Sequence, residues 1–190
     1  MKNFKRIDYL LFLAVFVLAS CSGTNTNNIN NEVSWENWLK SQIELLGHRN
    51  WIVVADAAYP LQSNSGITTI LSTDDHITTI KKVNALIQQQ KHIKPITFLD
   101  QELDFISEED AQGVTSFRTV IDTLISGKIK KEIHEDIIYK LDKASKLFNV
   151  LIIKTDYTIP YTSVFFQLDC KYWNPEAENR LRTTLEMSNK

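Results

Sequence analysis

Cysteine is scarce in this chain, which has only Cys21 and Cys170 among its 190 residues. Cys21 ends the tetrapeptide Leu18-Ala19-Ser20-Cys21, and if it is modified there, Cys170 is the single remaining thiol. An intramolecular disulfide is then excluded. We expect Cys170 to be buried as a small apolar residue, because Phe166 and Leu168 are close to it in the sequence.

The chain also lacks an apolar run long enough to cross a bilayer. The run from Tyr9 to Leu18 has about ten residues, whereas a spanning helix needs ~20. It follows a basic start and precedes small residues, which is the layout of a secretory signal over residues 1–21. The cysteine after Ala-Ser resembles a bacterial lipobox, whose thiol is lipidated. The alternative is a plain N-terminal membrane anchor with an incidental Cys21.

Residues 22–32 contain one large apolar side chain, so they are expected to form a flexible tether. Ser22 is not the aspartate associated with retention at the inner membrane. The sequence therefore predicts a protein of the bacterial cell envelope, lipid-anchored at the periplasmic face of the outer membrane, with residues 33–190 as one folded domain.

An excess of basic charge is absent too, since the formal net charge is −2. The scattered Lys and Arg residues argue against a nucleic-acid partner, which would need basic side chains clustered on one face. No Gly-x-Ser-x-Gly elbow of a serine hydrolase is present. No His, Asp or Glu pair has a convincing metal-binding spacing. We therefore expect no bound metal.

The apolar patterns in residues 33–190 alternate between helix and strand. Helices are predicted at 34–46, 75–90, 137–147 and 175–187, and a helix or mixed element at 114–124. Strands are predicted at 51–54, 67–72, 95–99, 149–154 and 163–168. An acidic turn or helix start is expected at 108–113. Ser34 is a plausible N-cap of the first helix, and Gly47 is expected to end it. This alternation predicts an α/β fold with three layers, in which helices flank a central sheet.

Two polar residues flank the predicted strand at 51–54. His48 stands just before it and Asp56 just after it. A carboxylate at the carboxyl end of a buried strand is where open α/β sheets place ligand-binding groups. The structural alternatives are a capping histidine and a turn-forming aspartate before Pro60.

Gly47-His48, Asp56-Ala57 and Pro60 have the spacing of the ribose pyranase and fucose mutarotase family, and this segment resembles it. The segment from Pro160 to Phe166 resembles that family's C-terminal sugar-contacting strand. The resemblance implies the three-layer α/β fold. It also implies a cofactor-free, ring-shaped homo-oligomer with sites at subunit contacts, which interconverts ring or anomeric forms of a free sugar such as ribose or fucose.

The resemblance further implies roles for individual residues. His48 would be the proton donor, while Asp56, Tyr161 and Ser163 would bind sugar hydroxyls. Ser163 departs from the family, which has an amide there. Another family position, which is His or Arg, falls on Tyr139 by ungapped counting; His134 is the alternative if the helix is shifted.

For the remaining histidines we expect ordinary surface positions. We predict that His134 is exposed in a charged run, and that His76 and His92 face solvent.

A neutral-range pKa makes histidine suitable for both proton transfers of mutarotation.

Two other readings of function remain open from the sequence. A non-catalytic sugar-binding or structural lipoprotein would keep the fold and lose turnover; Ser163 and Tyr139 favour it, whereas His48 and Asp56 oppose it. An assembly lipoprotein with a protein partner would be favoured if Trp35 and Trp38 formed an exposed apolar patch.

Overall fold

The computed structural model describes residues 34–125 and 127–189. The proposed signal peptide, Cys21 and the tether at 22–32 lie outside the described residues. No helix within the described ranges is both long and apolar enough to cross a membrane.

Six strands form one sheet, in the order β2-β5-β1-β6-β3-β4. In chain order they are β1 (Trp51–Ala55), β2 (Ile67–Leu71), β3 (Ile93–Asp100), β4 (Ile129–Glu132), β5 (Val150–Lys154) and β6 (Val164–Cys170). Strand β5 is parallel to β1 and β2, and β3 is parallel to β4. Strand β6 lies between β1 and β3 and is antiparallel to both.

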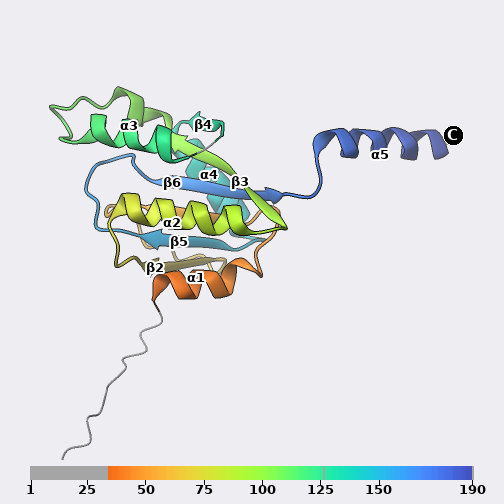
Figure 1. Ribbon diagram of the computed structural model, residues 1–190, viewed down its shortest axis with the longest axis horizontal. Helices are drawn as coiled ribbons and strands as arrows, with labels where there is room; N and C mark the ends of the chain where they lie inside the picture. Colours follow the sequence, from red (N-terminus) through yellow and green to blue (C-terminus); the bar gives the residue numbers. More distant parts are fainter. Residues whose placement is uncertain (1–33, 126, 190) are drawn as a thin grey trace, which may run out of the picture. The chain divides into compact units, whose positions relative to one another are not determined.

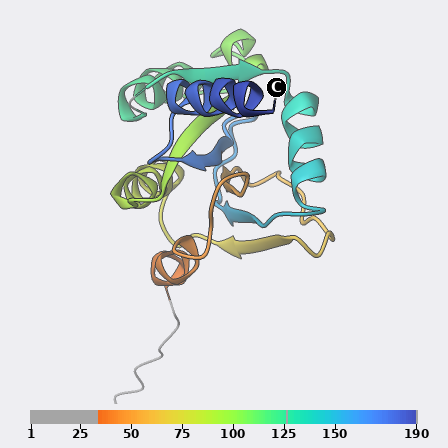
Figure 2. The ribbon, with the colours of Figure 1, turned by 90° about the vertical axis from the view of Figure 1, so that its right-hand side faces the viewer.

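The helices are α1 (Trp35–Ile43), α2 (His76–Gln89), α3 (Val114–Leu124), α4 (His134–Ala144) and α5 (Pro175–Ser188), with a short 3₁₀ helix η1 (Gln101–Phe105) after β3. Apolar residues of α1, α2 and α3 pack on one face of the sheet, and those of α4 pack on the other. Figure 2 shows α4 across the sheet from α2. The predicted three-layer α/β fold is confirmed.

Strand β1 shows why the sheet has helices on both faces. Ile52 and Val54 belong to the core under α1 to α3, whereas Trp51, Val53 and Ala55 belong to the core under α4. All five residues are buried. A strand covered on both sides needs apolar residues at every position, as β1 has.

The predicted helices and strands are all present, with shifted ends. Ser34 caps α1 as expected, by accepting a hydrogen bond from the Asn37 amide. The helix ends at Ile43, before Gly47, and the left-handed residue nearby is Arg49 with φ of 76°. Strand β4 was not predicted, because its sequence Ile-Lys-Lys-Glu is charged and it lies at the sheet edge.

Helix α5 follows β6 and contributes no buried residue (Figure 1). Cys170, the last residue of β6, is half-buried instead of buried as predicted. Cys170 is one of the residues that line a pocket beside Tyr172 and Trp173. Trp35 is buried, and Trp38 is half-buried against the core. These two residues therefore do not form the exposed apolar patch that would have favoured an assembly lipoprotein with a protein partner.

Candidate functional site

One edge of the sheet collects polar residues from several strands. Because β6 is antiparallel to its neighbours, its beginning lies at the same edge as the ends of β1 and β3. Asp56 follows β1, Asp100 ends β3, His134 begins α4 after β4, and Tyr161 precedes β6. Residues far apart in the sequence therefore meet at one place, where α/β sheets commonly bind ligands.

These four residues line a cavity of about 270 Å³. The rest of its wall comes from Ala58, Tyr59, Pro60 and Pro160. A second hollow, of about 280 Å³, adjoins it and shares Asp56, Ala58 and Pro160. Small-molecule sites typically measure about 300–1,000 Å³. The cavity lies just below this range, so it suits a small ligand.

Asp56 is held in place by two hydrogen bonds to its carboxylate. Oδ1 accepts from the Ala58 amide at 2.9 Å, and Oδ2 accepts from the Ser163 hydroxyl at 2.8 Å. Ser163 is itself buried, and its Oγ also accepts from the Asp56 amide at 3.2 Å. A carboxylate has about four acceptor positions, so Asp56 keeps capacity for ligand hydroxyls.

Asp100 and His134 form a pair inside the cavity wall. Asp100 Oδ1 lies 3.1 Å from His134 Nδ1, and Asp100 is only 1% exposed. Burial raises the pKa of Asp100 to about 6, against the opposing influence of His134 and with the help of the nearby carboxylates Glu102 and Asp56. Glu102 also accepts from the His134 amide, which fixes the start of α4.

Tyr161 completes the polar wall beside this pair. Its ring meets the His134 ring edge to face, with 5.6 Å between centroids. Its φ of 57° is in the left-handed region, which is uncommon for residues other than glycine. Strain of this kind gathers at functional sites. Tyr59 is buried beneath the cavity, and burial raises the pKa of its hydroxyl.

His48 lies away from this cavity, at the opposite edge of the sheet. Its Nδ1 is 3.0 Å from Asp169 Oδ1, near the end of β6, and Lys94 contacts the other oxygen of Asp169. The His48 side chain is 56% exposed. One chain therefore gathers Asp56 and Tyr161 at a single site but leaves His48 outside it.

Two further residues singled out from the sequence do not line the cavity. Tyr139 is in the middle of α4, 59% exposed, with Lys143 over its ring. Ser163 instead donates a hydrogen bond to the Asp56 carboxylate. His134, which was predicted to be exposed in a charged run, is instead half-buried and stands beside Tyr161.

Sequence reasoning missed Asp100 and Tyr59. Asp100 stands at the carboxyl end of a strand, as Asp56 does, so the signal used for Asp56 was available for it. Tyr59 carried no comparable signal, because an aromatic residue before a proline is compatible with many turns.

His76, predicted to face solvent, is instead 1% exposed. Its Nε2 donates to the Thr162 carbonyl at 2.9 Å, and its Nδ1 lies 2.8 Å from Thr155 Oγ1. The ring stacks on Tyr157 with 4.9 Å between centroids. His76 thus anchors both ends of the segment that carries Tyr161. His92 is half-buried, with Nε2 2.9 Å from the Leu46 carbonyl.

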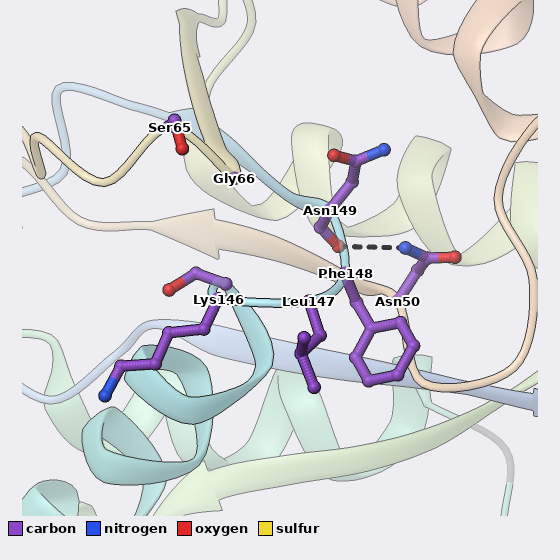
Figure 3. A pocket seen from close by; sticks show the side chains of 8 residues that line it. Asn50, Ser65, Gly66, Lys146, Leu147, Phe148 and Asn149 are labelled. Carbon is purple, nitrogen blue, oxygen red and sulfur yellow. Dashed lines mark hydrogen bonds between the residues drawn. The ribbon is translucent and has the colours of Figure 1, made fainter.

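A different pocket, of about 290 Å³, opens near the beginnings of β1, β2 and β5 (Figure 3). Its lining includes Asn50, whose amide donates to the Asn149 carbonyl at 3.3 Å. Lys146 is the ionisable residue among its lining residues. With no carboxylate or imidazole in that lining, it offers no acid and base pair, so we place the candidate site at the other edge.

No protein-family model matches the chain, and no curated protein sequence matches it. Similarity appears among solved structures. RbsD of Bacillus subtilis, complexed with D-ribose, aligns with a TM-score of 0.51 and 18% identity, over 70% of this chain and 91% of RbsD. The fucose mutarotase of Streptococcus pneumoniae, in complex with L-fucose, gives a TM-score of 0.47 and 19% identity, over 75% and 97% of the two chains.

FucU of Bifidobacterium longum gives a TM-score of 0.47 and 14% identity, over 70% of this chain and 92% of FucU. The alignment with RbsD supports the fold that the sequence resemblance implied. The chain has a six-stranded mixed sheet between helical layers, and this fold is similar to that of RbsD.

Proposed function

We propose that this protein binds a free monosaccharide in the cavity lined by Asp56, Asp100, His134 and Tyr161, and interconverts its ring or anomeric forms. The observation that carries the proposal is the gathering of two carboxylates, an imidazole and a phenol around one small cavity. Ribose and fucose are the first candidates, because of the family resemblance in the sequence.

The chemistry of a sugar suits this lining. Its hydroxyls donate to carboxylates such as that of Asp56, and they both donate to and accept from imidazole and phenol. Its C–H faces pack against flat or rigid surfaces, for which Tyr161, Pro60 and Pro160 are available. The cavity therefore combines polar groups that orient a ligand with apolar walls that enclose it.

Mutarotation opens the hemiacetal ring and closes it again. The ring oxygen must gain a proton while the anomeric hydroxyl loses one, so the reaction needs an acid and a base. His134 is available for one role within the chain. We propose that His48 of a second copy supplies the other, in line with the expected homo-oligomer whose sites lie at subunit contacts.

The second candidate is a sugar-binding protein without turnover. The observation that favours it is the position of His48, paired with Asp169 at the far edge of the sheet. If no second copy brings that imidazole to the cavity, the site binds a sugar but lacks the expected proton donor.

We also propose that the protein is a lipoprotein of the bacterial cell envelope, anchored through Cys21 after removal of residues 1–20. The lipobox-like sequence supports this proposal. An envelope location gives the protein access to sugars that have not yet entered the cytoplasm.

Saturation-difference and exchange NMR tests the proposal. The full chain, purified in detergent, is mixed with ribose, fucose and a panel of other monosaccharides. We expect saturation transfer to at least one sugar and faster exchange between its forms, both reduced in Asp56→Asn. Asp122→Asn is the matched control, because Asp122 is an exposed residue of α3 outside the cavity.

Each outcome separates the candidates. Faster exchange supports the mutarotase, whereas saturation transfer without faster exchange supports the binding protein. If no sugar shows either effect, or if Asp122→Asn loses them as Asp56→Asn does, the cavity is not a monosaccharide site.

A further inference from the structure

The Asp100 carboxyl group is unusual in how few partners it has. Oδ1 lies 3.1 Å from His134 Nδ1, whereas Oδ2 is buried without a hydrogen-bond partner among the described residues. A buried carboxylate is costly unless it is paired, so such a group persists where another role requires it. Among the described residues, His134 is the side chain within hydrogen-bond distance of Asp100, which directs attention to that ring.

The two residues are held by different elements of the fold. Asp100 ends β3, where it pairs in register with Glu132 of β4, while Leu99 before it pairs with Val164 of β6. The His134 amide is fixed by the Glu102 carboxylate. Because strand pairing holds Asp100 and the Glu102 carboxylate holds the His134 amide, the Asp100–His134 geometry is set by the fold.

We infer that Asp100 is a positioning residue that keeps the neutral His134 ring protonated on Nδ1 and thereby leaves Nε2 as the acceptor for a sugar hydroxyl. An ionised carboxylate can only accept, so the Nδ1 atom facing it must carry the hydrogen. In neutral imidazole the other nitrogen then has the lone pair. This inference rests on the proposed function, since it gives His134 the role of base.

The proton movements balance in this arrangement. Nε2 of His134 takes the proton of the anomeric hydroxyl as the carbonyl bond forms and the ring C–O bond breaks. The ring oxygen takes a proton from the second donor, for which His48 of another copy is the proposed group. Asp100 stabilises the imidazolium that results, and ring closure on the other face returns both protons.

Nitrogen NMR of the imidazole tests the tautomer without any sugar. Full-length protein labelled with ¹⁵N-histidine is recorded above pH 7.5, and His134 is assigned by comparison with His134→Gln. We expect His134 to show a protonated Nδ1 and a bare Nε2. In Asp100→Leu, which has no acceptor, the Nδ1-protonated fraction should fall, while Asp122→Asn should match the wild type.

A wild-type spectrum with the proton on Nε2 would overturn the inference, and so would an unchanged tautomer in Asp100→Leu. The wild-type spectrum alone can contradict the inference, so the test does not depend on whether Asp100→Leu folds. Because the measurement needs no ligand, it is independent of whether the cavity binds a sugar.

Sugar exchange kinetics test the consequence. Asp100→Asn should lower kcat by about tenfold, because a neutral amide stabilises the imidazolium less than a carboxylate does, with KM little changed. In the wild type, kcat should fall as Asp100 is protonated below about pH 6, with His134, Glu102 and Asp56 as the neighbouring titratable groups. In Asp100→Asn this fall should be smaller, because the contribution of Asp100 to it is removed. Equal losses in kcat and in sugar binding would instead show a merely structural role.

Discussion

His48 and Asp56 flank the same strand but lie at opposite edges of the sheet. His48 pairs with Asp169, whereas Asp56 is held by Ser163. The five residues of β1 between them span about 16 Å at ~3.3 Å per residue. A sugar bound at Asp56 therefore cannot reach His48 of the same chain.

The first prediction concerns this separation. His48→Ala and Asp56→Asn should each strongly reduce accelerated sugar exchange, because each would remove one half of the site that we propose to be shared between copies. Co-expressed and purified as a mixed oligomer, the two variants should recover part of the activity, since some contacts then combine an intact His48 with an intact Asp56. Exchange rates of the mixture, compared with those of each variant alone, check this.

The control mixture contains two preparations of Asp56→Asn, which should recover nothing. If the His48→Ala protein alone exchanges sugar as fast as the wild type, His48 has no part in the reaction. A group other than His48 must then supply the second proton transfer beside His134.

The second prediction concerns Ser163, whose hydroxyl donates to Asp56 and whose oxygen accepts from the Asp56 amide. Ser163→Ala should lower the free energy of unfolding by about 1–3 kcal/mol, because a buried hydrogen-bonded pair is broken. It should also weaken sugar binding, since the Asp56 carboxylate loses its orientation. Denaturant unfolding and ligand titration measure the two effects.

Ser107→Ala is a suitable comparison. The Ser107 hydroxyl is also bonded to an aspartate, Asp110, but that pair is exposed. It should change stability by less and leave binding unaltered. Sugar affinity that is equal in Ser163→Ala and the wild type would contradict the supporting role assigned to Ser163.

The third prediction concerns the pH dependence of stability through His76. Burial lowers the pKa of His76 below its ordinary value of 6.5. Its neutral form therefore stabilises the fold above pH 6.5, and that contribution is lost as the pH falls toward the lowered value. His76→Gln should be less stable at pH 7.5 by about 1–3 kcal/mol but lose less on acidification.

Urea unfolding at pH 7.5 and pH 5 gives the four values needed. His48→Gln, which changes an exposed ring, should follow the wild type at both pH values. If the wild type and His76→Gln lose the same stability between the two pH values, His76 does not titrate in this range.

The periodicity of apolar residues was sufficient to predict the layers of this fold, because both faces of β1 are covered and every position in it is apolar. It missed β4, since an edge strand with Lys130 and Lys131 buries too little to leave an apolar pattern. His76 was misplaced for a related reason: its neighbours in sequence are polar, but its hydrogen-bond partners Thr155 and Thr162 come from a distant loop.

The site was predicted only in part for the same physical reason. Asp56 and Tyr161 were found because their local segments carry a recognisable pattern. Asp100 and His134 are brought together by the pairing of β3 with β4, which no local pattern encodes. Counting residues to Tyr139 assumed that loop lengths are constant, and loops are where chains of one fold differ most.

The last prediction concerns the N-terminal segment. If Cys21 is lipidated, the protein expressed in a Gram-negative bacterium should fractionate with membranes, because acyl chains contribute about 0.8 kcal/mol per buried CH₂. Cys21→Ser should lose the lipid mass and the membrane association. Cys170→Ser should keep both, since Cys170 belongs to the folded domain. Mass spectrometry of the mature N-terminus and fractionation check this, and a Cys21→Ser protein that remains membrane-bound would favour the plain anchor over the lipoprotein.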